Sequence, residues 1–250
     1  DYIQHLIVTS NHATVLCFTN VGKVYRLKVY EVPQASRGAK GRPMVNLLPL
    51  DANETITAIL PVIDAPKKFK DRLADFQAFV KANAAKLQEN EIINSHFAEL
   101  EAALAELEDG ADDLSDALRI QLKQLGLELS TTDLDDEIIA DFAQQAEAVR
   151  KNFYVFMATE YGTIKRVELE QFSNVRSNGL RAIELNGDDT LIGVAITDGE
   201  QQIMLFSNEG KAIRFAETDV RSMGRSAKGV RRMRVAIGAA AQLEDAETDV

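Results

Sequence analysis

The sequence predicts a mainly β protein made of repeated antiparallel sheets, with an α-helical subdomain inserted between two of them. Three observations support this fold class. A turn glycine followed four residues later by an arginine occurs three times. The segments around these turns are short and rich in β-branched residues, as antiparallel strands are. Apolar residues at helical spacing are confined to residues 64–151.

Each repeat combines a β-rich run, a glycine turn, and a basic loop that a second glycine closes. The two glycines of a repeat are 19, 17 and 19 residues apart, and the last two repeats are offset by 48 residues. A period near 48 with about four strands in each unit is the spacing of a propeller blade. The glycine pairs are Gly22 and Gly41, Gly162 and Gly179, and Gly210 and Gly229.

Strand signals occupy residues 1–63 and resume over residues 152–238, which we interpret as two parts of one array of blades. Residues 1–18 align with residues 189–206, so we expect the chain to open in the last part of an earlier repeat. A single blade cannot bury both of its faces, and we therefore expect a partial ring. The expected strands are 6–9, 15–19, 24–29, 44–48, 55–62, 153–158, 163–169, 181–185, 191–197, 202–207, 211–215 and 230–235.

Residues 64–151 are expected to form an acidic helical subdomain inserted between the blades. The first two turn glycines are 140 residues apart, an excess of 92 over the next interval. We expect a helix to begin at Ser95 and another to end at Gly126. Residues 239–250 are expected to be a flexible acidic tail. The apolar spacing predicts four amphipathic helices, over 69–80, 97–107, 114–125 and 134–149.

The net charge of −11 hides a difference between segments. Residues 64–151 contain 20 acidic and 10 basic residues. Without this insert and the acidic tail, the chain has 15 acidic and 18 basic residues. The low overall pI therefore does not exclude a polyanionic partner for the β portion.

Cations recur at equivalent positions of the repeats, and we expect them to bind phosphate groups. Glycine lets the main chain approach a phosphate closely, and arginine supplies bidentate contacts. Arg26, Arg166 and Arg214 follow the turn glycines, and strand alternation predicts that they face solvent. Repeated cations suit a long polyanion and would contact the backbone of a nucleic acid without reading its bases. The candidates are Arg26, Arg37, Lys40, Arg42, Lys165, Arg166, Arg176, Arg181, Arg214, Arg221, Arg225, Lys228, Arg231 and Arg232.

Less specific interpretations of these features remain open. An arginine repeated in each blade can simply pair with an acid of the neighbouring blade. The glycine-flanked loops can be tight turns with solvated charges. The helical insert can be an inert or solubilising bundle, since loop insertions are tolerated, or an acidic regulator that repels DNA, mimics it or docks on another subunit.

The sequence contains no constellation expected of a catalytic or metal site. His5, His12 and His96 are scattered and lack the spacing of metal ligands. A phosphate-cradling GxxxxGK[ST] motif is absent. The single Cys17 fits a buried strand position in a reducing compartment, and no run of about 18 apolar residues suggests a membrane span. We expect a cytoplasmic chain without catalytic residues, metal, bound cofactor or membrane partner.

Several of these segments closely resemble the C-terminal domain of the A subunit of bacterial DNA gyrase. The resemblance covers about residues 1–62 and 153–235. It implies a six-bladed β-pinwheel, a variant of the propeller, whose basic edge wraps double-stranded DNA without reading its sequence. The segments are GKVYRLKVYEVP (22–33), RGAKGRPMVNLLPL (37–50), TITAILPV (55–62), VFMATEYGTIKR (155–166) and QIMLFSNEGKAIRF (202–215).

The resemblance also implies a larger assembly. The full enzyme would be an ATP-dependent type II topoisomerase that introduces negative supercoils, built from two A subunits and the B subunits. ATP and Mg²⁺ would belong to other parts of it, and the isolated chain is expected to be monomeric. A C-terminal domain of the topoisomerase IV type and a propeller scaffold for protein partners are the alternatives.

Two family features are missing from the sequence, and the insert has no counterpart in the common pattern. The signature loop Gln-Arg-Arg-Gly-Gly-Lys/Arg-Gly is absent, and we expect it before Asp1. The DNA-cleavage domain is absent too, so none of the five tyrosines is expected to be a nucleophile. The resemblance therefore assigns the helical insert no role.

Overall fold

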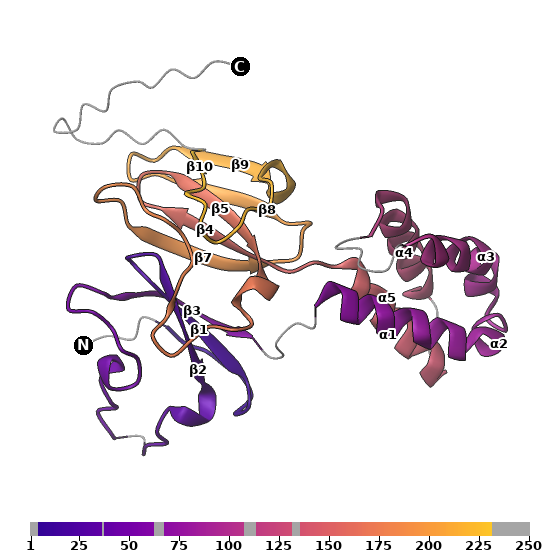
Figure 1. The fold of residues 1–250 in the computed structure, drawn as a ribbon, viewed down its shortest axis with the longest axis horizontal. Helices are drawn as coiled ribbons and strands as arrows, with labels where there is room; N and C mark the ends of the chain where they lie inside the picture. The colour runs from indigo at the N-terminus through magenta and orange to yellow at the C-terminus, as the bar shows by residue number, and fades with distance from the viewer. Residues whose placement is uncertain (1–4, 37, 63–67, 108–113, 132–135, 232–250) are drawn as a thin grey trace. The chain divides into compact units, whose positions relative to one another are not determined.

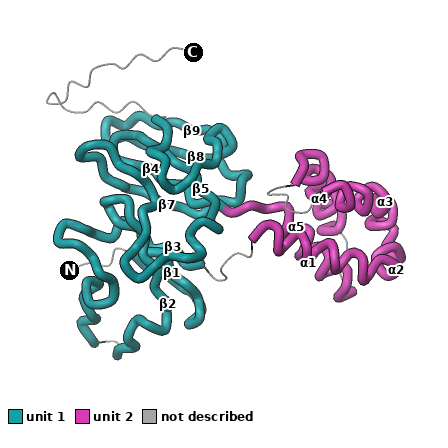
Figure 2. The backbone as a smooth tube through the Cα atoms, viewed as in Figure 1, with its two compact units in different colours: residues 1–65, 154–250 teal, residues 66–153 magenta. Residues whose placement is uncertain are grey.

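The computed structural model describes residues 5–36, 38–62, 68–107, 114–131 and 136–231. The chain divides into two compact units, which Figure 2 colours separately. Unit 1 comprises residues 1–65 and 154–250, and unit 2 comprises residues 66–153. Two of the candidate cations, Arg37 and Arg232, and the predicted tail 239–250 lie outside the described residues. Within the described ranges no helix is long and apolar enough to cross a membrane.

The first sheet of unit 1 is built on a hairpin that turns at Gly22. Strands β1 (Thr14–Thr19) and β2 (Lys23–Lys28) form the hairpin, and β3 (Ile56–Val62) pairs with β1. Gly22 has a φ of 75°, a conformation that glycine adopts without steric penalty. The fourth strand, β6 (Leu180–Arg181), pairs with β2, so the sheet order is β3-β1-β2-β6. Figure 1 labels β1, β2 and β3 of this sheet.

The second sheet repeats this arrangement. Its order is β10-β5-β4-β7, and a third hairpin forms a two-stranded sheet of its own. The strands of the second sheet are β4 (Tyr154–Thr159), β5 (Thr163–Glu168), β7 (Leu191–Thr197) and β10 (Val230–Arg231), and those of the third hairpin are β8 (Gln202–Phe206) and β9 (Ala212–Ala216).

The outer strand of each four-stranded sheet comes from a later part of the chain. Strand β6 follows the second hairpin in sequence but completes the first sheet, and β10 follows the third hairpin but completes the second. We call residues 180–184 and 225–231, which contain β6 and β10, the exchange segments. Successive sheets are therefore connected by shared strands as well as by packing.

Apolar side chains fill the space between successive sheets. Leu16, Phe18 and Val24 of the first sheet pack against Val155 and Met157 of the second. Strands β3 and β7 are also adjacent, since the Thr57 hydroxyl donates a hydrogen bond to the Leu191 carbonyl at 3.0 Å. The third hairpin covers the other face of the second sheet, where the rings of Phe156 and Phe215 have centroids 6.4 Å apart. Cys17 is buried in β1, as predicted.

Two predicted strands are absent, and the one predicted over 181–185 is reduced to the two-residue strand β6. Residues 6–9 form no strand, and residues Met44–Asn46 form the short 3-10 helix η2. Gly41 corresponds to Gly179 and Gly229, and the residues directly after those two glycines pair with the outer strand of the preceding hairpin, so residues 42 and 43 would need a hairpin of the same kind. The described residues contain no hairpin before β1 for them to pair with. Further 3-10 helices follow β2, β5 and β9: η1 (Val29–Glu31), η3 (Leu169–Phe172) and η4 (Glu217–Asp219).

Unit 2 is helical. Two predicted helix ends are wrong, because the Asn90 side chain caps the helix that contains Ser95, and because Gly126 lies inside a helix that runs on to Leu129. A glycine inside a helix costs only about 1 kcal/mol relative to alanine, which packing outweighs here. The helices are α1 (Phe69–Ala82), α2 (Ala84–Leu87), α3 (Glu91–Glu106), α4 (Asp116–Leu129) and α5 (Glu137–Arg150).

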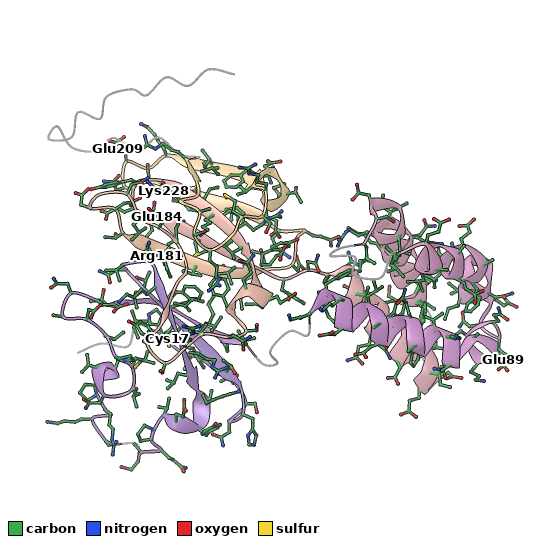
Figure 3. All side chains as sticks on the ribbon, viewed as in Figure 1. Cys17, Glu89, Arg181, Glu184, Glu209 and Lys228 are labelled. Carbon is green, nitrogen blue, oxygen red and sulfur yellow. The ribbon has the colours of Figure 1, made fainter. Side chains whose placement is uncertain are left out.

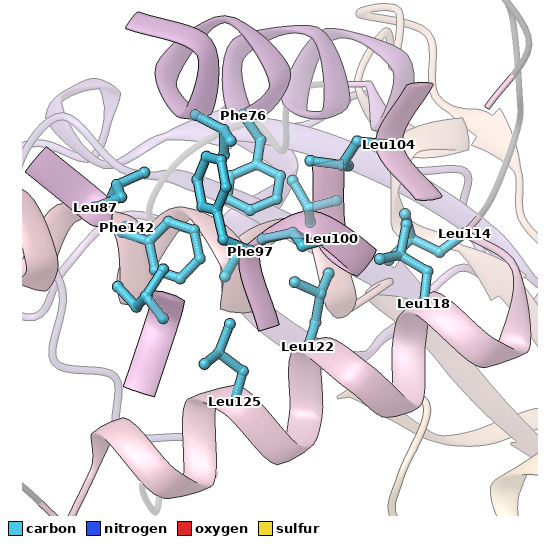
Figure 4. Close-up of a cluster of buried hydrophobic side chains, with 14 of the residues drawn as sticks. Phe76, Leu87, Phe97, Leu100, Leu104, Leu114, Leu118, Leu122, Leu125 and Phe142 are labelled. Carbon is cyan, nitrogen blue, oxygen red and sulfur yellow. The ribbon is translucent and has the colours of Figure 1, made fainter. Parts of the chain in front are cut away.

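The predicted apolar stripes form one core in unit 2. Phe76 and Phe142 meet at its centre, with ring centroids 5.6 Å apart, and leucines of α3 and α4 surround them (Figure 4). This core lies entirely within unit 2. In unit 1, two cores lie between successive sheets, and a third lies between the first sheet and residues 44–50. Each unit therefore buries its own apolar surface.

Candidate nucleic-acid interface

The exchange segments place an exposed arginine at the same corner of two sheets. Arg181 lies opposite Lys23 in the β6–β2 ladder, and Arg231 lies opposite Thr163 in the β10–β5 ladder. Lys23 and Thr163 are equivalent, since each directly follows the turn glycine of its hairpin. The two arginines are therefore repeated structurally as well as in sequence.

A glycine directly before β6 and another directly before β10 allow this close pairing. Gly179 has a φ of 78°, and a Cβ atom there would lie 2.6 Å from the Tyr25 ring. Gly229 has a φ of 94°, and a Cβ atom there would lie 2.5 Å from the Ile164 carbonyl oxygen. Both positions combine a left-handed conformation with contact to the neighbouring hairpin, so the basic loops end in glycine for a packing reason.

The arginines on the hairpins themselves are not all exposed. Arg26 and Arg214 face solvent, but Arg166 is 9% exposed, so the expectation that it faces solvent is wrong. Its Nη1 atom lies 3.8 Å from Oε2 of Glu217, and its guanidinium carbon lies 4.4 Å from the centroid of the Tyr154 ring. Glu217 belongs to the segment after the third hairpin, which covers this face. Arg166 therefore pairs with a neighbouring blade.

Lys165 is also buried, which removes it from the set of candidate phosphate ligands. Its side chain is 0% exposed, and its Nζ atom donates a hydrogen bond to the Ala182 carbonyl oxygen at 2.9 Å and another to that of Arg225. Burial and, to a smaller extent, the nearby charge of Arg225 lower the pKa of Lys165 to about 8, and the charge of Glu184 opposes this shift.

The remaining described candidates lie at the surface of unit 1. Arg225 is half-buried, and Lys228 is exposed with its Nζ atom 3.9 Å from Oε1 of Glu184. Figure 3 shows Arg181, Glu184 and Lys228 along the same edge of the unit. The other exposed candidates are Arg26, Lys40, Arg42, Arg176, Arg214 and Arg221.

Two buried glutamates hold the hairpins, and no sequence motif distinguishes them from the other acids. Glu54 accepts hydrogen bonds from the Thr19 hydroxyl at 2.7 Å and from the Tyr25 hydroxyl at 2.9 Å. Burial raises the pKa of Glu54, but these bonds, a main-chain bond from Asp51 and the charge of Lys23 outweigh it, so its pKa lies below the usual value. Glu217 accepts from the Thr197 hydroxyl at 2.6 Å. Both residues were missed by sequence reasoning because their role depends on contacts between distant strands.

Among the residues that the structure describes, no group of three or more His, Cys, Asp or Glu side chains is placed to hold a metal ion. The structure instead brings exposed cations, Arg181, Lys228 and Arg231, onto the exchange segments. Such a surface suits a polyanion.

Repeated four-stranded sheets that pack face to face and exchange their outer strands define a β-propeller-like domain. A family model described as "DNA gyrase C-terminal domain, beta-propeller" matches residues 13–63, 154–198 and 201–236, which is more than half of the chain. The chain belongs to this family. The matched residues leave out the helical unit.

The curated relatives include the A subunit of DNA gyrase from Pseudomonas aeruginosa, which is 42% identical over 238 residues. The match covers 95% of the chain and 21% of that protein. The A subunit of DNA gyrase from Escherichia coli is 34% identical, with 95% of the chain and 18% of that protein covered. The chain thus spans about a fifth of the length of these relatives.

Among solved structures, the C-terminal domain of a DNA topoisomerase IV has a TM-score of 0.53 at 20% identity. The match covers 91% of the chain and 45% of that structure. This similarity supports the propeller-like fold.

Proposed function

We propose that unit 1 binds double-stranded DNA along its basic edge, through the phosphate backbone and independently of sequence. The observation that carries this proposal is the repetition of Arg181 and Arg231 at the same exposed corner of two sheets. Equivalent corners offer equivalent contacts, which suits the regular spacing of phosphates more than any single base sequence. Membership of the gyrase C-terminal family supports the same partner.

In the full-length protein we propose that this binding wraps DNA and supports ATP-dependent negative supercoiling by a type II topoisomerase of the gyrase kind. A second copy of the A subunit, together with the gyrase B subunit, would complete the assembly in the bacterial cytoplasm. ATP and Mg²⁺ would act in those other parts. The names of the curated relatives support this assignment.

The dependence of DNA affinity on salt tests the binding. An edge that neutralises about 6 to 10 phosphates loses roughly 10³- to 10⁵-fold in affinity between about 50 and 200 mM salt. Two duplexes of unrelated sequence should give the same Kd and the same slope. A chain without measurable affinity at 50 mM salt would instead favour a scaffold for protein partners.

A double variant locates the interface. Arg181→Ala with Arg231→Ala should reduce the slope of log K against log salt by about 2, since each phosphate contact contributes about 0.9. Lys81→Ala with Lys86→Ala, on the helical unit, removes the same charge and should leave the slope unchanged. In the full-length enzyme, the arginine double variant should lower supercoiling. Decatenation measured in parallel separates gyrase-type from topoisomerase IV-type activity.

A further inference from the structure

Lys165 is a buried cation at a position where the other two hairpins carry Tyr25 and Ile213. All three residues are the third after a turn glycine, and they occupy the same register, opposite Cys17, Met157 and Leu205 respectively. An apolar or aromatic side chain thus suffices for packing at this point of a hairpin. A lysine loses its hydration on burial and is a costly choice here unless its amine has a specific role.

The role indicated by the contacts is to connect the two exchange segments. The Nζ atom of Lys165 donates to the carbonyl oxygen of Ala182, the residue after β6, and to that of Arg225, five residues before β10. The Lys228–Glu184 pair connects the same two segments at the surface. One amine therefore links main-chain segments that complete two different sheets.

The Ala182 and Ile183 amides also donate to the Gly22 carbonyl oxygen, but these segments have little other regular structure to hold them. Each contributes only a two-residue strand, β6 or β10, to its sheet. Together they carry Arg181 on one side and Arg225, Lys228 and Arg231 on the other. The distance between these two groups of cations therefore depends on the contacts that hold the carbonyl groups of Ala182 and Arg225.

We propose that Lys165 is a positioning residue that sets the spacing between the cations of residues 180–184 and 225–231, so that both groups contact one DNA duplex at once. This inference rests on the proposed DNA binding and adds a buried residue to it. The number of hydrogen bonds is consistent with this role, because the two N–H groups of a neutral amine match the two carbonyl acceptors that the site supplies. The lowered pKa of Lys165 favours this neutral form at mildly alkaline pH.

The test compares Lys165→Met with Lys86→Met in the 250-residue chain. Lys86 is an exposed lysine of unit 2 that pairs with Glu89, and at pH 7, below the pKa of both lysines, its replacement changes the net charge by about as much as that of Lys165. We expect hydrogen exchange of the amides of residues 226–231 to accelerate at least tenfold in Lys165→Met, in the absence of DNA. The slope of log K against log salt for a duplex should fall by about 2, because about two phosphate contacts are lost. Lys86→Met should change neither quantity.

Different outcomes separate the two proposals. If the wild-type chain binds no DNA, the proposed function fails. Amide hydrogen exchange then still shows whether Lys165 holds the two exchange segments together. If Lys165→Met is folded and keeps the wild-type slope, the positioning role is overturned, whether or not exchange accelerates. If Lys165→Met does not fold, Lys165→Ile installs the residue that the third hairpin has at this position and is judged by the same two measurements.

Discussion

At the scale of single residues, Arg166 and Arg214 are equivalent in sequence and different in environment. Arg166 lies beneath the third hairpin with Glu217 and Tyr154, whereas Arg214 is exposed. The Nε atom of Arg166 has no hydrogen-bond partner among the described residues. The arginine of a blade is therefore structural wherever another sheet covers it.

The substitution Arg166→Met should lower the free energy of unfolding of unit 1 by about 1 to 3 kcal/mol, because it removes a partner from the buried Glu217. Arg214→Met should change it by less than about 0.5 kcal/mol. Urea denaturation of both variants measures the difference. Equal losses would mean that the Glu217 contact contributes nothing to stability.

Lys165 gives the stability of unit 1 a dependence on pH. Its pKa is about 8 in the folded chain against an ordinary value of 10.5. Between these two values the unfolded chain binds more protons, so stability rises as pH increases from about 8 toward 10.5. The urea midpoint of wild type should rise between pH 8 and 9.5 relative to that of Lys165→Met. The raised pKa values of Cys17 and Tyr25 have the opposite effect above their ordinary values of 9 and 10, and the comparison with Lys165→Met removes both contributions.

Glu54 gives the stability of unit 1 a dependence on pH in the acid range. Its pKa is lowered in the folded chain, so its contribution to stability is present above its ordinary value of 4.5 and is lost as pH falls below that value. Glu54→Gln should therefore flatten the loss of stability between pH 5 and 3. Thermal denaturation across that interval tests this, and an unchanged profile would assign the acid sensitivity to other carboxylates.

At the scale of elements, the pairing of β6 and of β10 with their neighbouring hairpins depends on the glycine before each strand. Gly229→Ala places a Cβ atom against the Ile164 carbonyl oxygen at a positive φ, and should destabilise unit 1 by at least about 1 to 2 kcal/mol. Gly224→Ala lies in the same loop with no atom within 4 Å of the added carbon, and should change stability by less than about 0.5 kcal/mol. Calorimetric unfolding of the two variants provides the comparison, and indistinguishable curves would contradict the packing role of Gly229.

The hairpins and helices could be predicted from the sequence because their signals are local. Strand β7 has the predicted bounds of residues 191–197, and the apolar stripes predicted the four long helices, although α3 begins six residues before its predicted start at residue 97. The burial of Lys165 and Arg166 could not be predicted, because it depends on which sheet covers that face. The helical turn at Met44–Asn46 could not be predicted either, because it depends on how residues 44–48 pack against the first sheet.

At the scale of the whole molecule, the two units have separate cores. Residues 66–153 produced alone should unfold in one cooperative transition, because that unit buries its own leucines and phenylalanines. Replacing the unit by a short glycine-serine linker should change the Kd for DNA by less than about threefold near 0.15 M salt, where charges are screened beyond about 8 Å. A larger change in affinity, or a change in DNA bending, would instead identify the acidic unit as a regulator.

Strand exchange also determines when the first sheet is completed during synthesis on the ribosome. The edge of β2 stays unpaired until Leu180 and Arg181 have been made, and the 66–153 unit is translated within that interval. At about 5 to 20 residues per second, the unit prolongs the wait by roughly 5 to 20 s. The nascent polypeptide thus exposes an open β edge for longer than a chain without the insertion, which makes this stage the one most exposed to misassociation and to chaperone capture.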